Sequence, residues 1–333
     1  MNRLQPTTKD SHRQDLLFYV VEETENPSTD YYIRPYLEHQ SATYQVIKLG
    51  GALPDIAPDQ TVSIIFVRYI NTAWKRWVTR NRSRLDRVVL FIDDDILDWR
   101  VISHLPIGSH AKYALQARRH KRWFRSNTSL WVSTRYLQHK YRAWNPQLIG
   151  LHCPFAKPAP ITTDGAGALT VFYHGSYAHQ AETDWLFDVV ARVLQQEQDI
   201  RFELTGFAAT KKRFTGLRGV SIIDEMSWPD YRGFISTAGR SIGLAPLLDS
   251  EFNRARNHVK CFDITQAGAA GIFADHPVFQ GVIRHGQNGL LVPMHAASWV
   301  DAILRLARDP GFRYRLAKSA RQDFTSKQNR PVE

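Results

Sequence analysis

The second half of the sequence alternates apolar segments with amphipathic ones, and this alternation most restricts the fold. Candidate strands, in which apolar residues predominate or alternate with polar ones, cover residues 168–173, 200–207, 219–223, 241–247, 271–275 and 289–292. Between them, apolar residues recur at helical spacing in 182–196, 259–268 and 295–309. Strands that alternate with helices predict a doubly wound, parallel sheet.

Local signals predict where two of these helices begin and end. Ser227 precedes Trp228 and Pro229, which suits a helix start, because serine caps helices and proline fits the first turn. Gly268 follows an apolar helical run, and glycine commonly ends a helix because it tolerates positive φ. Both signals agree with the alternation.

The first half shows the same pattern less clearly, with candidate strands at 15–21, 44–49, 62–69, 87–95 and 129–134. We therefore expect an α/β protein with two Rossmann-like doubly wound domains facing a cleft, at whose carboxyl edges ligands bind. Residues 1–153 would form the N-terminal domain. Residues 154–167, rich in Pro, Gly and Thr, would be a linker. Residues 168–310 would form the C-terminal domain. Residues 311–333 would add a helix and tail, for which a return to the first domain stays open.

The charge is strongly positive, with a formal net value of +11. Much of the excess lies between residues 74 and 142, where aromatic residues interleave with basic ones around Trp74, Arg76, Trp77 and Arg80 and in 118–125. Such a surface attracts phosphates, nucleic acid or an anionic bilayer. No nucleic-acid motif accompanies it, so we expect no nucleic acid. We predict peripheral attachment to an anionic membrane; a solvated basic face, or tryptophans that pack inward, would explain the pattern equally well.

Two features bear on the compartment. The two cysteines, Cys153 and Cys261, are far apart and have no metal-site spacing. The polar start lacks the apolar centre of a secretion signal, and no apolar run approaches the length of a membrane span. We expect a cytoplasmic protein that associates with the inner face of the cytoplasmic membrane.

Three consecutive aspartates, Asp93, Asp94 and Asp95, end one apolar run of the first half. Carboxylate oxygens are ligands that Mg²⁺ or Mn²⁺ prefers, so a metal site is one interpretation. The alternatives are that the carboxylates position hydroxyl groups of a substrate, or that they fix a loop or a helix start.

The segment His174 to His179 links a predicted strand to a predicted helix. Gly175 would let the backbone approach a ligand, and amides at the following helix start would favour phosphate. Ser176 belongs to the same loop. His179 is the best-placed histidine for hydrogen bonding or proton transfer; further candidates are His104, His152 and His174.

A second group of polar residues follows the strand at 241–247. The basic and amide side chains of Asn253, Arg254, Arg256 and Lys260 could neutralise a pyrophosphate without a metal. Asp263 lies one helical turn after Lys260, where a carboxylate could bind ribose hydroxyls. A solvated helix with a Lys–Asp pair is the plainer alternative.

A third segment, residues 284–293, is a turn that leads into a strand. Gly286 and Gly289 suggest positive φ. Ligand contact and a purely structural role are both compatible with this pattern.

Taken together, 168–194, 242–292, 88–98 and 129–155 resemble GT-B glycosyltransferases, and more narrowly the retaining group 1 or family 4 enzymes. The resemblance implies a nucleotide-sugar donor bound mainly by the C-terminal domain, a saccharide or lipid-linked acceptor on the N-terminal side, and surface-polysaccharide or glycan synthesis. It also implies that no metal and no other cofactor is needed.

The resemblance assigns roles residue by residue. His179, Lys260 and Asp263 would be catalytic, with Lys260 on the diphosphate and Asp263 on the ribose. The residues expected to bind the donor are Gly175, Ser176, Asn253, Arg254, Asn288 and Gly289. Asp93, Asp94 and Asp95 would face the acceptor, and residues 224–228 would border the base.

The sequence departs from the family at two places. Ala255 stands where the first glutamate of the family's paired-glutamate motif is expected, and Asp263 replaces the second. The basic residues usual after the glycine loop are also missing, since Gln180, Ala181, Glu182 and Thr183 follow. An inactive GT-B-like binding scaffold therefore stays as an alternative, as does a metal-dependent transferase that uses Asp93 to Asp95.

Overall fold

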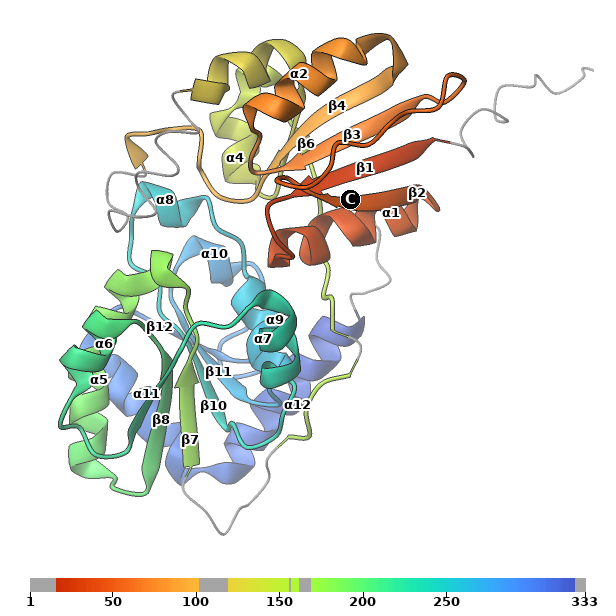
Figure 1. The fold of residues 1–333 in the computed structure, drawn as a ribbon. Helices are drawn as coiled ribbons and strands as arrows, with labels where there is room; N and C mark the ends of the chain where they lie inside the picture. Colours follow the sequence, from red (N-terminus) through yellow and green to blue (C-terminus); the bar gives the residue numbers. More distant parts are fainter. Residues whose placement is uncertain (1–15, 102–118, 156, 162–168, 327–333) are drawn as a thin grey trace, which may run out of the picture. The chain divides into compact units, whose positions relative to one another are not determined.

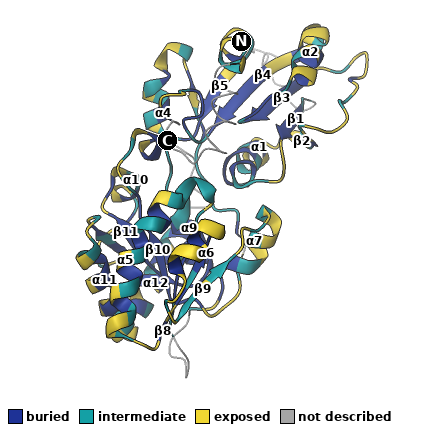
Figure 2. Ribbon diagram, turned by 60° about the vertical axis from the view of Figure 1, so that its left-hand side comes forward, coloured by how far each residue is buried: buried dark blue, intermediate teal, exposed yellow. Residues whose placement is uncertain are grey.

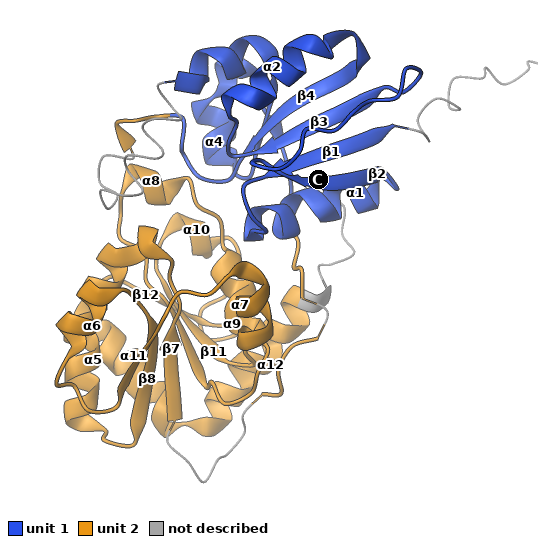
Figure 3. Ribbon diagram, viewed as in Figure 1, with its two compact units in different colours: residues 1–97, 115–150 blue, residues 98–114, 151–333 orange. Residues whose placement is uncertain are grey.

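The computed structural model describes residues 16–101, 119–155, 157–161 and 169–326. Within them the chain divides into two compact units, Met1–Leu97 with Leu115–Gly150, and Asp98–Ala114 with Leu151–Glu333 (Figure 3). His104 and residue 118 lie outside the described residues. Each unit contains one parallel sheet, which confirms the prediction of two doubly wound domains.

The first unit is built on a six-stranded sheet in the order β2-β1-β3-β4-β5-β6 (Figure 1). Its strands are β1 Leu17–Glu22, β2 Thr43–Lys48, β3 Val62–Val67, β4 Leu85–Ile92, β5 Ser129–Val132 and β6 Gln147–Leu148. Its helices include the π-helix Thr29–Ile33, α1 Arg34–His39, α2 Thr72–Arg80, α4 Arg135–Lys140 and the 3₁₀ turns Arg82–Arg84 and Arg142–Trp144. Strand β3 is buried at every position, as expected for a parallel strand covered on both faces.

The second unit has the order β12-β11-β10-β7-β8-β9. Its strands are β7 Leu169–Tyr173, β8 Ile200–Thr205, β9 Val220–Ile223, β10 Ile242–Ala245, β11 Ala270–Ala274 and β12 Leu290–Val292. Its helices are α5 Gln180–Gln196, α6 Ala208–Phe214, α7 Trp228–Ile235, α8 Glu251–Arg254, α9 Val259–Gln266, α10 Pro277–Gln280, α11 Ala296–Arg308 and α12 Pro310–Ser326, with a 3₁₀ turn at Tyr177–His179.

Helices cover both faces of the second sheet. Helices α5, α6 and α11 pack together on one face, and α7, α9 and α12 lie on the other (Figure 1). Helix α12 packs against α9, α11 and β11, so its contacts described here lie within the second unit. The buried residues form a continuous core along the strands (Figure 2).

The predicted helix signals act as expected. The Ser227 side chain accepts a hydrogen bond from the backbone N–H of Asp230 and caps α7. Gly268 follows α9 with a φ of +72°, and an added Cβ there would lie 2.5 Å from the Pro160 carbonyl oxygen. Only glycine fits this position without strain.

Candidate functional site

The order of the second sheet places β7 beside β10, and the chain runs outward from this pair in both directions. In doubly wound sheets, the loops that leave the carboxyl ends of such a pair diverge to opposite faces, and ligands generally bind there. Residues 174–179 follow β7, and 246–260 follow β10. Most of the donor-side residues predicted from the sequence therefore meet at one place.

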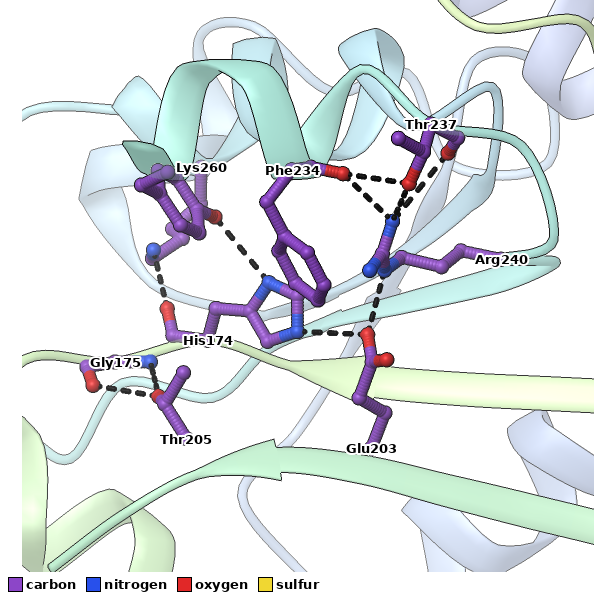
Figure 4. Close-up of polar contacts among 9 residues, drawn as sticks. His174, Gly175, Glu203, Thr205, Phe234, Thr237, Arg240 and Lys260 are labelled. Atoms are coloured by element: carbon purple, nitrogen blue, oxygen red, sulfur yellow. Dashed lines mark hydrogen bonds and ion pairs between the residues drawn. The ribbon is translucent and has the colours of Figure 1, made fainter. Parts of the chain in front are cut away.

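Lys260 lies beside the loop after β7 (Figure 4) and also pairs with Asp263. Lys260 Nζ donates to the carbonyl oxygen of His174 at 2.5 Å and to Asp263 Oδ2 at 3.0 Å. Asp263 is buried, whereas the Lys260 side chain keeps some exposure. The lysine is thus held at the carboxyl edge of the sheet by two oxygens.

The ring of His174 is fixed by a buried polar network. His174 Nε2 lies 3.1 Å from Glu203 Oε1, and Tyr231 Oη lies 3.4 Å from His174 Nδ1. Burial, which outweighs the attraction of Glu203, lowers the pKa of His174. A neutral ring would donate from Nε2 to the carboxylate and accept from the tyrosine hydroxyl at Nδ1.

Arg240 completes this network (Figure 4). Its Nε donates to Glu203 Oε1 at 2.5 Å. Its Nη1 donates to the Phe234 and Thr237 carbonyls at 3.1 and 3.3 Å, and the guanidinium lies 4.0 Å from the centre of the Phe234 ring. A cation on the last carbonyls of α7 stabilises the helix end. Arg240 therefore links α7, which follows the predicted base loop at 224–228, to the strands under His174.

Gly175 lies where a side chain does not fit. Its N–H donates to Thr205 Oγ1 at 2.8 Å, and the Thr205 hydroxyl donates to the Gly175 carbonyl at 2.7 Å. An added Cβ would lie 2.9 Å from His179 Cβ and 3.0 Å from Tyr173 Oη. Ser176 next to it is exposed. The loop is therefore tight, because Thr205 holds both backbone groups of Gly175, and Ser176 is its exposed residue.

His179 belongs to a second buried cluster on the other side of the loop. Its Nδ1 lies 3.7 Å from Glu182 Oε2, and Arg256 Nη1 lies 3.1 Å from Nδ1 and contacts Nε2. Glu182 Oε1 accepts from Asn253 Nδ2 at 2.7 Å. Burial, followed by the positive charge of Arg256, lowers the pKa of His179 to about 4. Burial alone would raise the pKa of Glu182, but His179 and Arg256 lower it to about 2.

Two predicted donor residues have other partners. Arg254 is exposed and forms a bidentate pair with Asp249, at 2.9 Å for both contacts. Asn288 is buried inside the turn, where it accepts from Arg284 N at 2.7 Å and donates to Asp323 Oδ2 at 2.8 Å. Asn288 thus ties the turn to α12.

The two glycines of this turn differ. Gly286 has the expected positive φ of +76°. For Gly289 the positive-φ prediction is wrong, since it is not among the positive-φ residues described. Its constraint is steric, because an added Cβ would lie 2.9 Å from the Phe273 ring.

In the first unit, the aspartates that follow β4 form ion pairs with basic side chains. Arg68 forms two contacts with Asp93, at 2.5 and 2.6 Å, and lies 3.6 Å from Asp94. Lys140 pairs with Asp95 at 2.6 Å. Burial would raise the pKa of Asp93, but the charge of Arg68 outweighs it and lowers the pKa. These ion pairs fix the loop that follows β4.

The membrane prediction fails for its two leading tryptophans. Trp74 and Trp77 are 0% and 6% exposed, and their indole N–H groups donate to the Leu49 and Pro54 carbonyls at 3.1 and 2.7 Å. They pack into the core because α2 is amphipathic and needs an apolar face. Within the described residues, no helix is long and apolar enough to cross a membrane.

A search of curated protein sequences gives no match. Residues 168–309, however, match the family described as Glycosyl transferases group 1. Residues 168–309, which make up less than half of the chain, are called the group 1 domain after this match. The group 1 domain contains both clusters around Gly175.

Solved structures extend the likeness to both domains. TarM matches with 13% identity and a TM-score of 0.54, over 80% of this chain and 52% of that one, so the chain spans about half the length of TarM. A sucrose-phosphate synthase from Thermosynechococcus elongatus matches with 15% identity and a TM-score of 0.60, over 94% of both chains. HepE of Anabaena, solved with UDP, matches with 13% identity and a TM-score of 0.53, over 95% of this chain and 97% of that one. The fold is GT-B.

Several residues around the group 1 site escaped the sequence analysis. They are Glu182, Thr205, Glu203, Tyr231 and Arg240. Arg256 is among the cations that the sequence places near the site, but not among the residues expected to bind the donor. A charged residue inside an apolar parallel strand, as Glu203 is within 200–205, is a signal that could have been found.

Proposed function

We propose that the group 1 domain binds a nucleoside diphosphate sugar between the β7 loop and the start of α9, and that the protein transfers the sugar to a saccharide or lipid-linked acceptor. The observation that carries this proposal is Lys260, which is held by His174 O and Asp263 at the carboxyl edge of the β7–β10 pair. An ammonium group there can neutralise a diphosphate.

In the reaction, the bond between the anomeric carbon and the phosphate oxygen breaks, and the oxygen keeps the electron pair. Lys260 and the backbone N–H of the exposed Ser176 stabilise the charge on the departing diphosphate. The acceptor oxygen forms the new bond to the anomeric carbon, and its proton passes to the departing phosphate oxygen. By resemblance, the anomeric configuration is retained, and Asp263 binds the ribose.

We propose that no metal ion takes part. The cations that occupy Asp93 and Asp95 support this, since a carboxylate paired with Arg68 or Lys140 has less charge to offer an ion. The experiment is turnover with and without EDTA. Loss of activity on chelation, restored by Mn²⁺ and abolished in Asp94→Asn, would support the metal-dependent alternative.

The acceptor is proposed to be a saccharide or a lipid-linked one at the inner face of the cytoplasmic membrane. With Trp74 and Trp77 buried, only a solvated basic face, including the exposed Arg76, Arg80 and Arg122, supports membrane attachment. Flotation with phosphatidylglycerol vesicles at low salt should carry the protein upward. Salt at 0.5 M should release it, because charges are already screened beyond ~10 Å at about one fifth of that ionic strength. Protein that stays at the bottom at low salt would contradict attachment.

The donor site is tested with Lys260→Ala. A thermal-shift screen with UDP, GDP, dTDP and their sugars first identifies the donor, because a bound ligand raises apparent stability. Lys260→Ala should then lower turnover by about a hundredfold or more in a protein that still unfolds cooperatively, at a lower unfolding temperature because the buried Asp263 loses its cation. Lys318→Ala, exposed on α12, is the control. Full activity of Lys260→Ala would contradict the role.

A binding scaffold without catalysis is the second candidate. Ala255 favours it, since this buried position lacks the carboxylate of the family. The scaffold would bind a nucleotide sugar and leave it intact with every acceptor offered, whereas the transferase would release the nucleoside diphosphate.

A further inference from the structure

The loop after β7 contains no lysine or arginine from His174 to Thr183. A nucleoside diphosphate nevertheless brings two adjacent phosphates to this loop, and the proposed function gives them one cation, Lys260. Lys260 also shares its charge with Asp263 at 3.0 Å. A second cation would be needed to offset the remaining charge.

Arg256 is the cation that the fold places on the other side of the same loop. Its Nη1 contacts the ring of His179, the last residue of the 3₁₀ turn after Gly175. The guanidinium lies 5.0 Å from the centre of the Phe252 ring. Among the described residues, its Nε is buried and has no hydrogen-bond acceptor. A buried N–H of an arginine without an acceptor is costly, and a ligand oxygen would remove that cost.

Glu182 fixes the positions of His179 and of the segment that carries Arg256. It is 2% exposed, and its Oε1 accepts from Asn253 Nδ2 at 2.7 Å and from the Leu248 N–H at 3.4 Å. Its Oε2 lies 3.7 Å from His179 Nδ1. The carboxylate thereby joins α5 to the segment that carries Arg256. A carboxylate facing Nδ1 also keeps the proton there, so that Nε2 is free to accept from Arg256.

The neighbouring arginine is not available for this role. Arg254 is engaged by both oxygens of Asp249 on the surface. Among the described residues, Arg256 has no carboxylate partner at ion-pair distance, and its side chain makes its hydrogen-bond contacts with His179.

We propose that Arg256 is the second cation of the diphosphate site, and that Glu182 and His179 are positioning residues that aim it at the ligand. This inference rests on the proposed function. It explains how the group 1 domain binds a diphosphate although its glycine loop has no basic residue, because the charge comes from the β10 side of the crevice.

The test compares a nucleoside diphosphate with its monophosphate, using the base that the screen selects. Calorimetry gives the ratio of the two Kd values for wild type, Arg256→Gln and Glu182→Gln. We expect Arg256→Gln to weaken the diphosphate at least about tenfold, with a change of less than about threefold for the monophosphate. Damage to the fold alone would weaken both ligands alike.

The positioning role has its own signature. If Glu182 acts through Arg256, then Glu182→Gln weakens diphosphate binding in wild type but adds nothing in the Arg256→Gln background. The exposed pair of Arg308 and Glu197, 2.8 Å apart, supplies the matched controls Arg308→Gln and Glu197→Gln, which should bind as wild type. If Arg256→Gln does not fold, Arg256→Lys keeps the charge without the planar fork and should lose part of the diphosphate preference.

The outcomes are distinct. Unchanged diphosphate binding in Arg256→Gln, or in a folded Arg256→Lys when the former does not fold, overturns the inference and leaves the proposed function standing. Equal, additive losses from Glu182→Gln and Arg256→Gln overturn the positioning role. A wild-type protein that binds no nucleoside diphosphate overturns the proposed function itself.

Discussion

Replacing Glu203 with leucine should destabilise the second unit and weaken donor binding together. The carboxylate is the shared acceptor of Arg240 Nε and His174 Nε2. Leucine removes that acceptor and leaves the guanidinium of Arg240, which is 5% exposed, without its anion. Glutamine keeps one acceptor oxygen, so Glu203→Gln should be milder.

The magnitude follows from the burial of the pair. Breaking a buried ion pair by removing one partner costs about 3–5 kcal/mol. The Glu203 side chain is 21% exposed, so water can reach the site, and the lower end, about 3 kcal/mol, applies to leucine. At roughly 2–4 °C per kcal/mol for a domain of this size, the unfolding temperature should fall by roughly 6–12 °C.

Scanning calorimetry measures the stability, and titration with the donor nucleotide measures binding. Because His174 presents its carbonyl to Lys260, a loosened His174 should also weaken the nucleotide. The double variant Glu203→Leu with Arg240→Met should recover much of the stability, since no buried charge remains. A Glu203→Leu protein as stable as wild type, or a double variant that is less stable than both single ones, would refute the reasoning.

Three shorter predictions follow. Gly268→Ala should lower the free energy of unfolding by roughly 3 kcal/mol, because the position has a φ of +72° and an added Cβ would meet backbone atoms. Gly281→Ala, where an added Cβ would meet nothing within 4 Å, is the control and should change it little. Urea titrations measure both. The pKa of His179 in the folded protein, about 4, lies below its ordinary 6.5. The stability that neutral His179 contributes is therefore complete above pH 6.5 and is lost as the pH falls toward 4. His179→Gln should flatten the curve of unfolding free energy against pH over this range. Arg68→Ala should destabilise the first unit by about 3 kcal/mol by leaving Asp93 unpaired, and Arg68→Ala with Asp93→Ala should recover part of it; equal stability of single and double variants would contradict the pairing.

The strands and long helices could be predicted because their signals are local. A buried parallel strand is a continuous apolar run, and α11 shows its apolar stripe directly in the sequence. Helix α6 was missed because it is short and buries only Thr210 and Phe214 among lysines and an arginine. Short helices with so few buried residues have no period to detect.

The site was predicted to the level of loops but not of side chains. Gly175, His179, Asn253, Lys260 and Asp263 do converge at the β7–β10 edge. The choice of Arg254 over Arg256 could not be made from spacing, since both stand near a helix end and only the tertiary contacts separate them. The same limit applied to Trp74 and Trp77, whose mixture with basic residues is equally typical of a membrane surface and of an amphipathic core helix.

The ion pairs of Asp93 and Asp95 could not be predicted from the sequence. Three carboxylates in a row are a reasonable metal-site signal, but their partners, Arg68 and Lys140, lie 25 and 45 positions away from Asp93 and Asp95. Pairing over such separations depends on the sheet order, which places β3 and β5 on either side of β4.

A crystal structure of the protein soaked with the nucleoside diphosphate that binds best would examine the central claim most directly. The account predicts that the two phosphates lie beside the backbone of Gly175 and Ser176, within hydrogen-bond distance of Lys260 Nζ, with no metal between the ligand and the protein. A diphosphate bound through an ion at Asp93 to Asp95, or bound away from the β7–β10 edge, would contradict it.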